Sequence, residues 1–113
     1  MSEREEERAA ELREAQSKAA QLFHAIDEQG LIRAGITESR LNADIYALAE
    51  KMYGISTYWH KRIVRAGKNT LIPYAENPPD LTLREDEILF LDLGPVFEEW
   101  EADFGRTFVL AGC

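Results

Sequence analysis

The sequence predicts an α+β fold in which two N-terminal helices pack on one face of a largely antiparallel sheet. Apolar residues recur at steps of three and four over residues 2–29 and again over residues 38–53, which is the helical period. Short β-branched and aromatic runs, separated by turn residues, follow Gly54. The last of them, residues 87–110, has the strand-turn-strand pattern of a hairpin.

The first predicted helix runs from about residue 2 to residue 29 and ends at Gly30, a residue suited to a helix C-terminus. Residues 1–18 begin with almost entirely charged turns, so we expect a charged helical extension that projects into solvent. His24 lies beside the apolar stripe, and we expect a structural role for it. Only the later part of the helix is expected to pack. The apolar residues that recur at the helical period are Leu12, Ala15, Ala19, Leu22, Phe23 and Ile26.

The second predicted helix has clear signals at both ends. Thr37 is a good N-cap, Glu38 suits the first turn, and Gly54 ends the helix. These two helices can cover one face of a sheet. The residues expected on the buried face of the second helix are Leu41, Ile45, Leu48, Ala49 and Met52.

Short strand signals lie between the second helix and the hairpin. They occur at residues 57–59, 63–64, 71–73 and 81–83, and the polar residues 84–86 form a turn before the hairpin. His60 lies among the first of these signals. Its position favours an exposed strand-end residue, and a substrate-facing role is the alternative.

The hairpin places one aspartate in each limb. Side chains alternate along a strand, so Asp92 shares a face with Ile88, Phe90 and Gly94, while Leu89, Leu91, Leu93 and Pro95 share the other. A loop at residues 97–98 places Asp92 opposite Asp103, and a loop at residues 98–99 makes them diagonal neighbours on the same face. A three-residue loop would separate them. In the same-face registers, one side of the hairpin is core and the other is acidic.

Two like charges across a strand pair destabilise a sheet, unless a cation lies between them. Glycines next to both acids, Gly94 and Gly105, leave room for such a cation. A divalent metal is one explanation of the pair Asp92 and Asp103. The alternative is that both aspartates end strands, accept backbone hydrogen bonds or face water.

The length and net charge of the chain limit which classes of molecule it can bind. The chain has 113 residues and a formal net charge of −8, which suits one domain and argues against nucleic acid or an anionic membrane as a partner. No apolar run approaches a membrane span, and the charged N-terminus is unlike a signal peptide. Cys113 is the single cysteine, so no internal disulfide can form, and we expect a cytoplasmic location.

The order of motifs resembles the N-terminal half of the pita-bread metallopeptidases, which include methionine aminopeptidase, Xaa-Pro aminopeptidase, prolidase and creatinase. The resemblance runs from about residue 19 to residue 112 and implies that residues 1–113 are a single truncated domain. The motifs that carry it are Gly35-Ile-Thr-Glu38, Gly67-Lys-Asn69, Ile72-Pro-Tyr74, Asp92-Leu-Gly94 and Ala102-Asp-Phe-Gly-Arg-Thr107.

The resemblance implies a two-metal centre of manganese, cobalt, zinc or iron. Asp92 would bind one ion and Asp103 would bridge both, and the reaction would be removal of the N-terminal residue of a peptide. Tyr74 stands where many relatives have a substrate-contacting His, and a phenol cannot replace imidazole as a proton donor near neutral pH. The remaining ligands of the family, one His and two Glu, come from a second half.

Two functions of different class follow. The first is a chain of a metal-dependent aminopeptidase, inactive alone, that binds a complementary C-terminal half. The second is a non-catalytic pita-bread-like module that binds a peptide or protein, and a gene fragment without a role of its own is a third possibility. A half-fold would leave an open sheet edge, so we also expect association, with a homodimer as one form.

Overall fold

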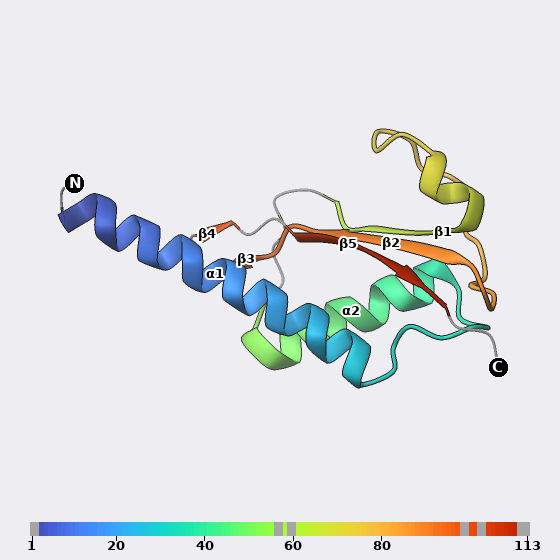
Figure 1. Cartoon of the computed structure of the whole chain (residues 1–113), viewed down its shortest axis with the longest axis horizontal. Coiled ribbons are helices and arrows are strands. Elements are labelled where there is room, and N and C mark those ends of the chain that lie inside the picture. Colours follow the sequence, from blue (N-terminus) through green and yellow to red (C-terminus); the bar gives the residue numbers. More distant parts are fainter. Residues whose placement is uncertain (1–2, 56–57, 59–60, 98–99, 102–103, 111–113) are drawn as a thin grey trace.

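A computed structural model describes residues 3–55, 58, 61–97, 100–101 and 104–110. The predicted α+β architecture is confirmed: two helices cover one face of a three-stranded antiparallel sheet of order β1-β2-β5. Figure 1 shows the helices on one side of the sheet and the segment after β1 on the other. The elements are α1 (Glu3–Glu28), α2 (Glu38–Tyr53), β1 (Ile63–Ala66), the 3-10 helix η1 (Gly67–Leu71), β2 (Ile88–Leu93), β3 (Val96–Phe97), β4 (Trp100–Glu101) and β5 (Phe104–Val109).

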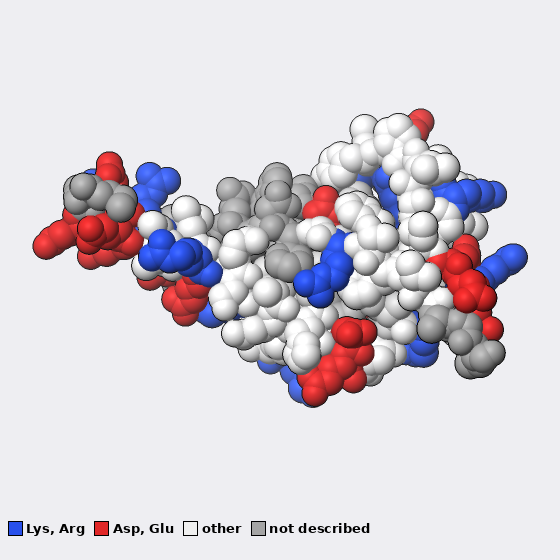
Figure 2. Space-filling model, viewed as in Figure 1, with Lys and Arg blue, Asp and Glu red and all other residues white. Residues whose placement is uncertain are grey.

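The fully buried residues of helix α1 lie from its middle to its C-terminal end. Its buried residues begin at Ala15, and Leu12 is 41% exposed although it belongs to the apolar period. The reason is that the first turns extend past the sheet (Figure 1), where charged side chains of both signs surround the helix (Figure 2). Neither α1 nor α2 is both long and apolar enough to cross a membrane.

Helix α2 begins and ends at the predicted residues. The Thr37 hydroxyl accepts a hydrogen bond from the Arg40 N–H at 3.1 Å, and Gly54 has φ of 69° at the C-terminus. Met52 is 37% exposed, in contrast to the prediction. In that last turn Tyr53 packs against the core instead, and its hydroxyl donates to Gln21 Oε1 at 2.9 Å.

The sheet has the predicted alternation and selects one of the two same-face registers. Leu89, Leu91 and Leu93 are fully buried beneath the helices. Asp92 pairs with Gly105 across β2 and β5, and Phe97 pairs with Trp100 across β3 and β4, which is the register expected for a loop at residues 98–99. The opposite face of β2 is therefore free to carry polar groups.

The strand expected at residues 71–73 is absent, and of the signal at residues 57–59 only Tyr58 is described. Residues 67–71 form a 3-10 helix that ends at Leu71, and residues 72–73 have no regular structure. Gly67 takes a φ of 53°, and its carbonyl accepts from the Thr70 hydroxyl at 2.8 Å. Tyr58 makes only an isolated bridge with Pro95.

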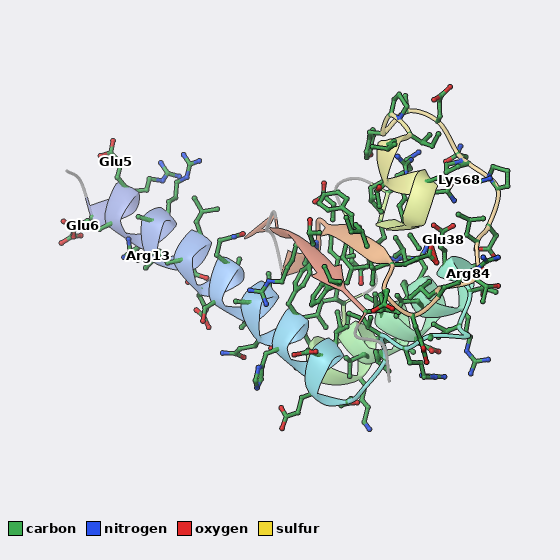
Figure 3. All side chains as sticks on the ribbon, turned by 45° about the vertical axis from the view of Figure 1, so that its right-hand side comes forward. Glu5, Glu6, Arg13, Glu38, Lys68 and Arg84 are labelled. Carbon is green, nitrogen blue, oxygen red and sulfur yellow. The ribbon has the colours of Figure 1, made fainter. Side chains whose placement is uncertain are left out.

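A buried carboxylate connects three segments to the start of α2. Glu38 is buried and accepts hydrogen bonds from the Ala66 N–H at 2.7 Å, the Leu81 N–H at 3.0 Å and the Asn69 side-chain amide at 3.1 Å. It lies between α2 and η1 (Figure 3). Every group around the carboxylate is a donor, and the N-terminus of α2 also favours negative charge.

Replacing this carboxylate by an amide tests its structural role. Glu38→Gln places an NH₂ group against backbone donors, and we expect a loss of roughly 2 kcal/mol in the free energy of unfolding, measured by urea denaturation. The exposed Glu50 of α2 provides the matched control, because Glu50→Gln makes the same charge change without removing such contacts. Equal stability of the two variants would show that Glu38 does not hold these segments together.

Candidate functional site on the open face of the sheet

The sheet face opposite the helices brings together one acid and several small or apolar residues. In the β1-β2-β5 register, Asp92 lies on the central strand between Ile63 of β1 and Gly105 of β5. Side chains of directly opposed residues point to the same face. The residues of this face are Ile63, Arg65, Ile88, Phe90, Asp92, Gly105, Thr107 and Val109.

Gly105 leaves space beside the Asp92 carboxylate. A Cβ atom at position 105 would lie 3.6 Å from Asp92 Oδ1 and 3.5 Å from the Phe90 ring, so any side chain there would fill that space. Asp92 itself is half-buried. The structure thus provides a hard oxygen donor beside a position where only a methyl group is missing, and carboxylate oxygens are ligands that divalent ions prefer.

The other predicted ligand, Asp103, lies outside the described residues, and so does the candidate substrate residue His60. Among the residues that are described, no three His, Cys, Asp or Glu side chains come close enough to hold a metal ion together. Asp92 fits one place in a metal site, and a stable site needs further oxygen or nitrogen ligands.

Tyr74 lies in the segment that follows η1. Its side chain is 50% exposed, and its hydroxyl accepts a hydrogen bond from the Lys61 N–H at 3.3 Å. The Lys61 ammonium lies 4.9 Å from the centre of the Tyr74 ring and donates to Asn77 Oδ1 at 2.8 Å. The attraction between the Lys61 ammonium and the Tyr74 ring stabilises the ring in this position.

Arg65 holds the Tyr74 segment over the sheet face that carries Asp92. Its buried guanidinium donates to the carbonyl oxygens of Ile72, Pro73 at 3.2 Å, Tyr74 at 3.4 Å and Glu76 at 2.7 Å. Because Arg65 pairs with Phe90, its side chain is on the Asp92 face. Sequence reasoning missed this role, although a lone arginine within the apolar run Ile-Val-Arg-Ala was a usable signal.

The outer edge of β5 presents backbone groups that have no strand beside them in the described part of the chain. The Leu110 N–H donates to the Glu87 carbonyl at 3.0 Å, which shows that residue 110 directs its groups to β2. Alternation then directs the N–H and C=O groups of Gly105, Thr107 and Val109 outward. Val109 is also 69% exposed, so this edge is open and partly apolar.

Solved structures with the same fold belong to peptidases. The chain superposes on the X-Pro aminopeptidase of Thermotoga maritima with a TM-score of 0.77 at 23% identity, covering 92% of this chain and 28% of that one. For the prolidase of Pyrococcus horikoshii the TM-score is 0.73 at 23% identity, with 89% and 28% covered. A His243Ala variant of Escherichia coli aminopeptidase P gives 0.76 at 24% identity, with 91% and 22% covered.

These likenesses show that the chain has the fold of the N-terminal half of a pita-bread metallopeptidase, as the resemblance predicted, and that it spans less than a third of each of the three neighbours. No curated protein sequence matches the chain. The sequence model of metallopeptidase family M24 matches residues 10–112. Because this match covers nearly all of the sequence, the chain belongs to metallopeptidase family M24.

Proposed function

We propose that residues 1–113 form the N-terminal half-domain of a metal-dependent aminopeptidase of the Xaa-Pro kind, which removes N-terminal residues from peptides. Membership of family M24 supports the metallopeptidase class. The observation that supports a site is the position of Asp92, which lies opposite Gly105 on the side of the sheet away from the helices.

In this proposal Asp92 binds one ion and Asp103 bridges two, and the ions are manganese, cobalt, zinc or iron. Divalent ions bound there would supply Lewis acidity toward the scissile carbonyl and a nucleophilic water. Tyr74 contributes a phenol, held by Lys61 and by the carbonyl contacts of Arg65, for contact with the substrate. His60 is a second proposed substrate contact.

The remaining ligands must come from residues other than those described. The chain covers 28% and 22% of two of its structural neighbours, so most of each of those proteins has no counterpart here. We propose that a complementary C-terminal half adds its strands at the open β5 edge and supplies one His and two Glu. A homodimer would cover the same edge but repeat the same residues, so this chain alone is expected to be inactive.

A non-catalytic binding module remains the second candidate function. It is favoured by the exposed apolar side chains Ile88 and Val109, which pair on the open face and suit contact with another chain. For both candidate functions we propose a cytoplasmic location, because the chain has a single cysteine among 113 residues and disulfides are rare in the cytoplasm.

Titration of MnCl₂ into the chain, followed by calorimetry, tests the role of Asp92. We expect weak binding that Asp92→Asn abolishes, because the variant removes the negative oxygen donor. Asp27→Asn on exposed α1 makes the same charge change and should leave binding unaltered. Equal manganese binding by the two variants would show that Asp92 is not a ligand. Sub-micromolar binding by the unaltered chain would contradict the proposal that its ligand set is incomplete.

Gly105→Ala tests whether the space beside Asp92 is used. The added methyl group makes ordinary contacts of 3.5–3.6 Å, so the free energy of unfolding should stay near that of the unaltered chain. The same methyl group occupies the space next to Asp92 Oδ1, and we expect manganese affinity to fall by about tenfold. Unchanged affinity, with folding intact by circular dichroism, would place the ion elsewhere.

A further inference from the structure

A groove lies at the β1 edge of the sheet, between the outer side of β1, the first turns of α2 and residues 77–80. Its cavity volume is about 260 Å³. It shares Ile63 and Arg65 with the open face, but within the described residues neither the proposed metal ligands nor the proposed substrate contacts line it. The residues that form it include Ser39, Asn42, Arg62, Val64, Asn77 and Asp80.

The backbone of β1 offers a hydrogen-bond donor and an acceptor to this groove. The Ala66 N–H donates to Glu38 Oε2 at 2.7 Å, so Ala66 directs its backbone away from β2. Alternate residues of an antiparallel strand point their N–H and C=O groups to the same side, so those of Val64 also point outward. The backbone groups of Ile63 and Arg65 form the hydrogen bonds to β2. Within the described residues, the N–H and C=O groups of Val64 have no backbone hydrogen-bond partner outside the sheet.

Arg62 is held in a fixed orientation at the same groove. Its guanidinium carbon lies 4.8 Å from the centre of the Tyr46 ring and 4.6 Å from that of Tyr58, and its Nε donates to Asn42 Oδ1 at 2.6 Å. Burial raises the pKa of Tyr58, and the positive charge of Arg62 opposes that rise, as expected for a close cation. An oriented guanidinium fork suits a carboxylate.

The local charge of the groove is positive, although the whole chain is acidic. Three cations line it, Lys61, Arg62 and Arg65, against two carboxylates. Both carboxylates already accept hydrogen bonds: Glu38 as described above, and Asp80 from the Ser39 N–H at 2.9 Å and the Ser39 hydroxyl at 2.6 Å. An acidic partner therefore complements this groove.

We propose that the outer edge of β1 binds an extended acidic segment of another protein as an added strand. One residue of the segment exchanges backbone hydrogen bonds with Val64, which is the mode of β-augmentation. A Glu or Asp two positions away lies opposite Arg62, on the same face, and its carboxylate binds the guanidinium. The small cavity limits this contact to a few residues.

The probe is the peptide acetyl-Thr-Val-Thr-Glu-Thr-amide, titrated into the ¹⁵N-labelled full chain at millimolar concentrations and followed by NMR. We expect shifts of the Val64 amide and the Arg62 Nε–H signals. The same peptide with Gln in place of Glu should bind about tenfold more weakly, because it loses a charge-assisted hydrogen bond. Using the unaltered protein with two peptides avoids any effect of substitution on folding.

Variants of the chain give a second, independent readout. Arg62→Gln should lower affinity for the Glu peptide to that of the Gln peptide, whereas Arg33→Gln, in the exposed connection before α2, should leave it unchanged. Three results would overturn the proposal: no shift at Val64, equal affinity for the two peptides, or shifts confined to Gly105 and Thr107 on the β5 edge.

Discussion

The antiparallel register between β2 and β5 decides what each face of the sheet can do. Side chains alternate with a period of two, so the register that buries Leu89, Leu91 and Leu93 under the helices also places Asp92 on the open face beside Gly105. A slip by one residue would bury the acid and expose the leucines. The hydrophobic core and the candidate metal face therefore depend on one arrangement of the two strands.

Two buried charges of opposite sign organise the irregular segments around that sheet. Glu38 accepts from backbone and amide donors at the end of β1, in η1 and at Leu81, while Arg65 donates to carbonyls of the segment that carries Tyr74. Neither residue needs a partner of opposite charge, because hydrogen bonds replace the solvent lost on burial. In this way segments without regular structure take defined positions on both sides of β1.

Local signals predicted most of this fold, and tertiary contacts account for the rest. Thr37 and Gly54 mark α2 because caps act within one turn, and parity alone placed Asp92 on a polar face. Leu12 and Met52 fit the helical period but lie where the sheet does not cover them, which no periodicity can show. The contacts of Arg65 with carbonyls seven to eleven residues later depend on the path of the chain after β1 and were not predictable from spacing. Parity also paired Asp92 with Asp103 and suggested a divalent metal, whereas the two-metal centre was implied only by the family resemblance, and Asp103 lies outside the described residues.

The most direct test of this account is the NMR measurement of cross-strand contacts in the hairpin. Because Asp92 directs its backbone groups toward β1 and Gly105 directs its own outward, the two are a non-hydrogen-bonded pair with their Cα atoms close together. We predict a strong nuclear Overhauser effect between the Hα protons of Asp92 and Gly105. A strong effect between the Hα protons of Asp92 and Asp103 would show the other register and contradict the arrangement on which the proposed metal face depends.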